Sequence, residues 1–448
     1  MVSVCICVVA TLVAFFAGRR SLVAGVLVVL ATGYAYGIVR ANLLETFSHF
    51  IFDATVVGLY VAQLPNLTKL SKNAQFCHLK RWVGLLILWP ALLFLIPVQD
   101  PLIQLVGLRG NTFLLPFLLI GGGLEREELN RLALGVAAFN SLAFVLAGLE
   151  FFVGLEPFFP QNVVTQLIYK SKDVANYTAY RIPSSFIGAH AYGGTIVATL
   201  PFLLGAWFQK YRGSWQRYFL FTALVMSILG VFLSGSRMHF VVMSFVLIVG
   251  TFSARLKLGT RLAWLVALLA IGLVVSGESR LQRFRELSGT DFVSQRISSS
   301  VNTGFFEILD KYPLGKGLGA GGTSIPYFLL GLVKDHVWFE NEYARILLEE
   351  GIPGLCLWVS FILWALTRRV TYREDAWGFG RRLAWFVVAA CFASGLIGTG
   401  LLTSIPQTCL LLLTAGWIAA PLERGTTACQ APETQVQAGS AIPVWQYD

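Results

Sequence analysis

Apolar blocks follow one another along almost the whole chain and are separated mostly by short polar stretches. Most blocks have a hydropathy and a length that suit a helix crossing the roughly 30 Å hydrocarbon layer of a membrane. The pattern predicts an all-α, polytopic transmembrane helical bundle with about 12–13 spans and a large periplasmic loop. The blocks are residues 2–16, 21–38, 48–63, 82–97, 111–123, 132–152, 189–207, 218–234, 238–253, 262–277, 351–367, 383–400 and 403–420.

Two of these blocks leave the number of spans open. Block 48–63 contains the acidic residue Asp53, and block 111–123 is short and ends in consecutive glycines. A charge inside a span is costly, and a short block does not reach across the hydrocarbon layer. Each of the two is therefore either a span or a re-entrant segment.

Charge gives the predicted bundle a direction. The chain has 34 Lys and Arg against 24 Asp and Glu, and in a soluble protein this excess would suggest a nucleic-acid partner. Here most basic residues lie in short loops on one side, which the positive-inside rule makes cytoplasmic, so no nucleic-acid partner is expected. The two long polar segments, residues 154–188 and 278–340, then face outward, into the periplasm or its equivalent. We therefore expect a multi-pass membrane protein.

The same pattern divides the chain into three parts. Residues 1–153 are N-terminal transmembrane helices, and residues 154–420 contain both long polar segments and the remaining spans. Residues 421–448 are polar and poor in apolar side chains, which predicts a disordered cytoplasmic tail.

Candidate chemistry first appears in segment 278–340. Its glycines between Gly315 and Gly322 permit turns with positive φ that aim backbone N–H groups at one point, and Lys311 and Lys316 add positive charge. Such a stretch suits an anion, but glycine runs also mark ordinary flexible loops. It is not a Walker A loop, because no Gly-Lys-Ser/Thr follows at the required spacing.

The residues after this segment predict a helix. Asn341 is suited to cap its start, and Gly351, just before Pro353, is suited to end it. Arg345 and Glu349 are four residues apart and would share one face. The pattern is also typical of a surface helix with a solvated charged face.

Two further candidates lie where outer segments meet predicted spans. Ser234-Gly235-Ser236-Arg237 predicts a tight turn, and Arg237 in it either binds a substrate anion or extends to lipid phosphates. His190, which follows Arg181, is at the start of a span, where a histidine is also common as a hydrogen-bonded structural residue.

Together these features resemble the O-antigen ligase and polysaccharide polymerase family, multi-span glycosyltransferases that act on lipid-linked glycans. The most specific match is at residues 340–354, where Asn341, Gly351 and Gly354 fall at the family's positions. Glu340 replaces the histidine that family ligases carry, and polymerase-like members fit this replacement better.

The resemblance extends over about residues 181–420, so that residues 154–420 are expected to be a ligase- or polymerase-like transmembrane domain. Its other elements are the turn at 234–237, Arg296, the segment Tyr312 to Gly317 and the segment Arg181 to Gly194.

The resemblance implies the transfer or polymerisation of glycan units from an undecaprenyl-diphosphate-type carrier. The reaction would take place at the outer face of the inner membrane, in O-antigen (lipopolysaccharide), capsule or exopolysaccharide synthesis. Neither long segment has an Asp-x-Asp that would hold a metal at the diphosphate, so arginines are expected to stabilise it, with no metal or cofactor. Arg237 and Arg296 are assigned to the diphosphate as catalytic residues, with Arg280 and Arg181 as weaker candidates.

The acceptor hydroxyl needs a base as it attacks the anomeric carbon, and Glu340 is the first candidate. An inverting transfer is implied by the family's presumed mechanism. The other candidates for the base are Glu342, Asp335, His336 and His190, and the remaining predicted substrate-binding residues are Lys316, Asn341 and Arg345.

Two alternatives share these sequence features. A transporter or flippase of lipid-linked glycans should carry charges deep inside several helices, whereas the clear acid in the middle of a predicted span is Asp53, which favours the enzyme. A non-catalytic member of a polysaccharide assembly complex is the second. The expected partners are a lipid-diphosphate-linked glycan donor, a sugar or lipid-linked acceptor, the membrane and other polysaccharide-assembly proteins.

Overall fold

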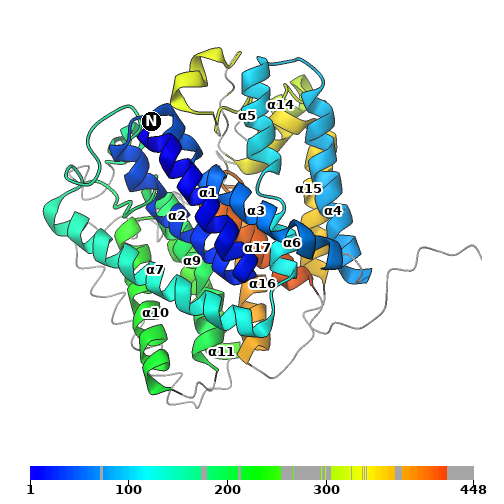
Figure 1. Cartoon of the computed structure of the whole chain (residues 1–448). Helices are drawn as coiled ribbons and strands as arrows, with labels where there is room; N and C mark the ends of the chain where they lie inside the picture. Colours follow the sequence, from blue (N-terminus) through cyan, green and yellow to red (C-terminus); the bar gives the residue numbers. More distant parts are fainter. Residues whose placement is uncertain are drawn as a thin grey trace, which may run out of the picture.

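The structure is a computed structural model that describes residues 1–70, 74–172, 179–209, 213–253, 266, 294, 298, 304–323, 325–334, 337, 339, 341–368 and 376–420. Every regular element in these ranges is a helix, and the helices pack side by side in a bundle (Figure 1). Within these ranges, eight helical segments are long and apolar enough to cross a membrane, and two shorter helices are also apolar. The prediction of a polytopic membrane bundle is confirmed.

The first part of the chain follows the predicted blocks with shifted ends, and the largest difference is in block 111–123. Helical structure there begins earlier, at Pro101, because Asp100 caps the helix by accepting a hydrogen bond from the N–H of Leu102 at 2.9 Å. The helices are α1 (Val2–Arg20), α2 (Leu22–Asn42), the 3₁₀-helix η1 (Thr46–Phe50), α3 (Ile51–Leu70), α4 (Ala74–Phe94), α5 (Pro101–Thr112), α6 (Phe117–Gly122) and α7 (Arg126–Val153).

The second part of the chain follows its predicted blocks except at blocks 383–400 and 403–420, where residues 395–406 form a non-helical segment between two helices. Block 262–277 and the predicted disordered tail, residues 421–448, lie outside the described residues. The helices are α8 (Gln166–Lys170), α9 (Ala189–Trp207), α10 (Ser214–Ser234), α11 (Arg237–Ser253), α14 (Phe305–Lys311), the 3₁₀-helix η3 (Tyr327–Leu332), α15 (Glu342–Thr367), α16 (Ala376–Ser394) and α17 (Gln407–Ala419).

Helix α9 lies at the centre of the bundle, in contact with α7, α10, α11, α16 and α17. Nearly all its residues are buried, as expected for a helix that is apolar on every face.

Glycines allow close contact between other pairs of helices, most clearly between α6 and α17. A methyl group added at Gly121 would collide with the carbonyl oxygen of Leu413, and one at Gly416 with that of Leu118.

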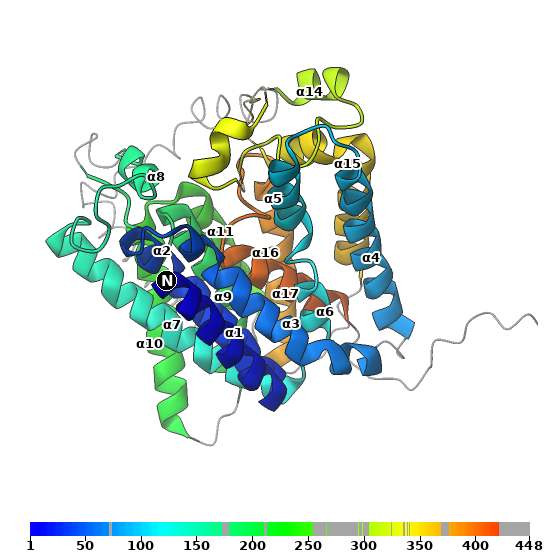
Figure 2. The same ribbon diagram turned by 45° about the horizontal axis from the view of Figure 1, so that its top comes forward.

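The two long polar segments meet at one end of the bundle. Helix α8 belongs to the first, and η3 and α14 belong to the second, and all three lie at the same end (Figure 2). Residues of α8 and η3 line a common cavity. The end of the bundle that the sequence analysis selected therefore contains a cavity built from both segments.

Candidate cavity for an anionic amphiphile

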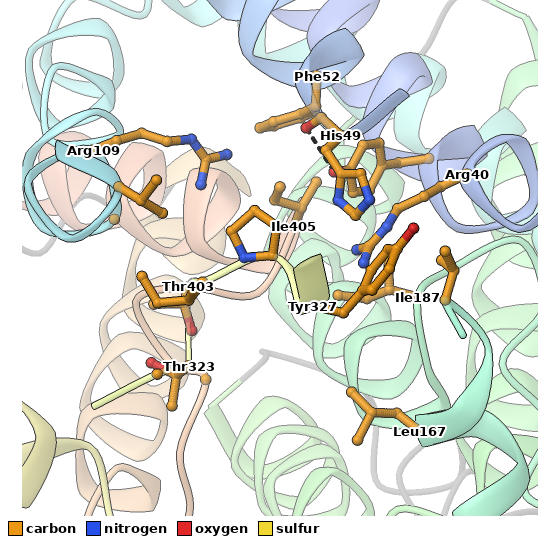
Figure 3. A pocket seen from close by; sticks show the side chains of 18 of the residues that line it. Arg40, His49, Phe52, Arg109, Leu167, Ile187, Thr323, Tyr327, Thr403 and Ile405 are labelled. Atoms are coloured by element: carbon orange, nitrogen blue, oxygen red, sulfur yellow. Dashed lines mark hydrogen bonds between the residues drawn. The ribbon is translucent and has the colours of Figure 1, made fainter. Parts of the chain in front are cut away.

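A cavity of about 590 Å³ lies between the helix ends and the two long polar segments. Figure 3 shows several of its walls, with Arg40 and Arg109 extending toward the cavity from different helices. The walls come from the end of α2, from η1 and α5, from the residues around α8, from the residues around η3, and from the segment before α17. Their main members are Tyr36, Arg40, His49, Phe50, Arg109, Val163, Leu167, Lys170, Ile187, Thr323, Tyr327, Leu330, Thr399, Gly400, Leu402 and Thr403.

The charged residues in the described lining are all basic: Arg40, Arg109 and Lys170. Arg40 is in the last turn of α2, and its buried Nε has no hydrogen-bond partner in the described part of the chain. Arg109 is paired with Asp53, whose carboxylate accepts hydrogen bonds from Nε and Nη2 at 2.7 and 2.5 Å. The cavity thus offers positive charge and suits an anion, and among the described residues Arg40, unlike Arg109, has no carboxylate partner.

Aromatic side chains hold the 3₁₀-helices η1 and η3 together beside Arg40. The hydroxyl of Tyr36 donates to the carbonyl oxygen of His49 at 2.9 Å, and the guanidinium carbon of Arg40 lies 6.0 Å from the centre of the Tyr36 ring. The His49 ring packs against Tyr327 and Phe328, with ring centres 5.7 and 5.4 Å apart. These contacts fix one wall of the cavity.

Apolar side chains surround the basic residues and continue to the outside of the cavity. Leu167 is 76% exposed, Val163 is 51% exposed and Leu330 is 44% exposed, although each also lines the cavity. A mostly apolar lining with a few converging cations matches a ligand that has both an apolar body and an anionic group.

Two residues predicted from the sequence, Arg181 and His190, lie near each other and close to the turn that carries a third, Arg237. The ring of His190 lies 4.4 Å from that of His239, two residues after Arg237, and Arg181 interacts electrostatically with His190. The Oγ of Ser236 is 2.8 Å from Nδ1 of His239. Ile187 lines the cavity, and His190 is three positions further along the chain, so their Cα atoms are within about 11 Å.

The turn that carries Arg237 has the predicted form. Gly235 ends α10 with a left-handed φ of 60°, and Arg237 is the first residue of α11. Arg181 and His190 therefore lie beside the turn that carries Arg237, and the roles of all three in binding stay predictions.

Lys316, Asn341 and Arg345 lie elsewhere, around the first turns of α15. Asn341 caps this helix as predicted, its Oδ1 accepting from the N–H of Ala344 at 2.6 Å. Gly351 interrupts the helix with φ of 70° and ψ of −172°. Lys316 is buried, with Nζ 5.3 Å from the centre of the Tyr312 ring. Direct substrate binding by these residues stays a prediction.

Other predicted site residues lie outside the described part of the chain, so their roles stay predictions. They are Glu340, Arg296, Arg280, Asp335 and His336.

The glycine-rich segment adopts the predicted turns. Gly315, Gly317, Gly319 and Gly322 have φ between 69° and 96°. The N–H of Gly321 points at an anion, which is the protein's own Glu349 carboxylate, at 3.2 Å. At least one N–H group of the glycine-rich segment is therefore already bonded to a carboxylate of the neighbouring helix α15.

Arg40, His49 and Arg109 were not among the site residues predicted from the sequence. A signal for Arg109 was present, because an acid inside a span is expected to pair with a base inside another span. Asp53 was identified, but its partner lies on a helix whose start was predicted too late.

Comparison with known proteins does not identify a family for this chain. No protein-family model and no curated protein matches the chain. The resemblance to the O-antigen ligase and polymerase family therefore rests on the residues quoted above.

Proposed function

We propose that this protein is a membrane glycosyltransferase that transfers or polymerises glycan units from an undecaprenyl-diphosphate-type carrier. The reaction takes place at the outer face of the bacterial inner membrane, and a polymerase is favoured over a ligase. The observation that supports this proposal is the basic cavity with an apolar rim, located where both long polar segments meet the helix ends. A prenyl diphosphate needs both properties.

In this proposal the diphosphate lies between Arg40 and Arg109. A guanidinium stays protonated and donates two parallel hydrogen bonds to phosphate oxygens, so it stabilises the negative charge that builds on the leaving group. Arg40 provides most of this effect, because Asp53 already neutralises Arg109. Lys170, exposed at the end of α8, adds a further positive charge.

The acceptor sugar hydroxyl attacks the anomeric carbon while a base takes its proton. Glu340 is the proposed base, and His190, near the cavity wall at Ile187, is the alternative. Glu342, the other described candidate, has its carboxylate bonded to Arg345, Gly400 and Leu401. The hydroxyls of Thr323 and Thr403 line the cavity and are suited to hydrogen-bond a sugar.

The test is a reconstituted reaction with a synthetic lipid-diphosphate oligosaccharide, in which product length and released carrier diphosphate are measured. Arg40→Ala and Glu340→Gln should each lower turnover, and Arg40→Ala should remove about 2–4 kcal/mol of transition-state stabilisation. Arg217→Ala, an exposed arginine at the far end of α10, is the matched control and should turn over like wild type. No glycan transfer by wild type, with or without a separate acceptor, would refute the enzyme.

A transporter of lipid-linked glycans is the second candidate, and ionisable side chains inside several helices favour it. Asp53 and Arg109 form an ion pair between α3 and α5, and Glu150 is buried near the end of α7. Movement of a labelled lipid-linked glycan across a vesicle membrane, without any chain extension, would support the transporter.

A further inference from the structure

A buried cluster of charged and polar side chains lies on the first turns of α15 and the facing side of α5. We call it the Arg345 cluster, and it consists of Asn111, Glu342, Arg345 and Glu349. Arg345 is fully buried and donates from Nε to Glu342 at 2.7 Å and from Nη1 to Asn111 and Glu349 at 2.7 and 2.9 Å. Asn111 in turn donates to Glu349 at 2.7 Å.

The carboxylates of Glu349 and Glu342 also accept hydrogen bonds from backbone N–H groups in two segments of the cavity wall. The second oxygen of Glu349 accepts from the N–H of Gly321, directly before the lining residues Gly322 and Thr323. The second oxygen of Glu342 accepts from the N–H groups of Gly400 and Leu401, at 2.7 and 3.1 Å, and Gly400 is itself a lining residue.

A third wall is joined through α5. Asn111 directly follows the lining residues Arg109 and Gly110. The Arg345 cluster therefore connects three separate walls of the cavity, each at a residue that lines it or is adjacent to one that does.

Stability alone is a weak explanation for the cluster. Removing charged groups from water costs several kcal/mol per ion, and well-packed apolar residues are often as stabilising as a buried ion pair. Buried charge networks do fix one arrangement of the groups that they bind, because any other arrangement leaves charges unpaired.

We propose that Glu342, Arg345 and Glu349 are positioning residues that set the spacing of the three cavity walls, and so the placement of a bound donor. They act through the backbone of residues 321–323 and 399–403 and through α5, and they do not contact the substrate. The effect on turnover rests on the proposed function, while the effect on wall spacing does not.

The proposal can be tested by exchanging the carboxylate of Glu349 and the amide of Asn111 between these two positions. Glu349→Gln leaves Arg345 with one carboxylate fewer and should loosen the walls. Adding Asn111→Asp returns the carboxylate to the same pair of side chains, since an aspartate at position 111 accepts from both Arg345 and the new amide. Glu307→Gln, an exposed glutamate in α14 paired with Lys311 at 3.6 Å, is the matched control.

The first measurement is the distance distribution between spin labels on reactive amino acids incorporated at Thr323 and Thr399. Glu349→Gln should broaden the distribution, the double exchange should restore it, and Glu307→Gln should leave it unchanged. If Glu349→Gln does not fold, Asn111→Ala serves instead, because it removes two hydrogen bonds and no charge. An unchanged distribution in the folded variant would overturn the proposal.

The second measurement is turnover per bound donor, which a mere loss of folded protein does not change. Glu349→Gln should lower it about tenfold or more, and the double exchange should recover most of it. Broader distances with unchanged turnover per bound donor would overturn the positioning role. If wild type shows no turnover, the proposed function fails, and the distance measurement still decides whether the cluster holds the walls.

Discussion

Arg109 on α5 holds both carboxylate oxygens of Asp53 on α3, through hydrogen bonds of 2.7 and 2.5 Å. The Arg109 side chain is only 30% exposed and the Asp53 side chain 13%, so each charge is stabilised largely by the other and little by water. The pair joins two helices and also sets the charge of the cavity, because it neutralises one of the two arginines in the lining.

Loss of one member of this pair should destabilise the bundle more than loss of both. Arg109→Ala leaves the Asp53 carboxylate without its partner and should cost about 1–3 kcal/mol of unfolding free energy. The double variant Asp53→Asn/Arg109→Gln should cost less, because an amide pair can hydrogen-bond without a buried charge. Unfolding in mixed detergent micelles measures both. Equal losses of unfolding free energy in the single and the double variant would show that the unpaired Asp53 charge is not the cause of the destabilisation.

The glycine contact between α6 and α17 provides a second prediction. Gly416→Ala should lower the midpoint of unfolding, since the added methyl group meets the backbone of Leu118 and forces the helices apart, at a cost of about 1–3 kcal/mol. Gly148→Ala on α7 is the control, because no atom outside the helix lies within 4 Å of the added group. Similar midpoints for the two variants would contradict this account of the packing.

Asn140 joins four helices through its side-chain amide. Its oxygen accepts from the hydroxyl of Tyr34 at 2.6 Å, and its nitrogen donates to Thr199 and Ser227 at 2.8 and 2.9 Å. Asn140→Ala should cost about 1 kcal/mol of unfolding free energy, because buried polar groups lose their partners inside the bundle. Ser141→Ala removes only a hydroxyl bonded within its own helix and should cost less.

The sequence predicted most of the helices because the bundle is built from long apolar blocks. The central helix α9 and the Gly235 turn before Arg237 have the expected positions. The cap at Asn341 and the break at Gly351 were also visible, since each depends on residues a few positions apart.

The cavity was less accessible to sequence reasoning, because its residues come from segments far apart in the chain. Arg40 is a single arginine at the end of an apolar block. Nothing near it in sequence indicates that its Nε is buried without a partner among the residues that the structure describes. Spacing predicted that Arg345 and Glu349 share one face of their helix, and they form an ion pair there. That this face is buried, contrary to a solvated surface helix, and contacts Asn111 is a result of the fold.

Labelling from each side of the membrane tests the orientation that the proposed function requires. A cysteine at Leu167, which is 76% exposed beside the cavity, should react with an impermeant thiol reagent added outside the cytoplasmic membrane. A cysteine at Ser214, at the far end of α10, should react only from the cytoplasmic side. The reverse pattern would remove the cavity from the outer face.

Photo-crosslinking inside the cavity tests the central claim most directly. A photoreactive residue at Val106, in the cavity wall, should crosslink a radiolabelled prenyl diphosphate, and an excess of unlabelled prenyl diphosphate should suppress the crosslink much better than the prenyl alcohol. The same residue at Leu142, exposed on α7, should give no crosslink that the diphosphate suppresses. No crosslink at Val106, or equal suppression by the alcohol, would contradict an anionic lipid site between Arg40 and Arg109.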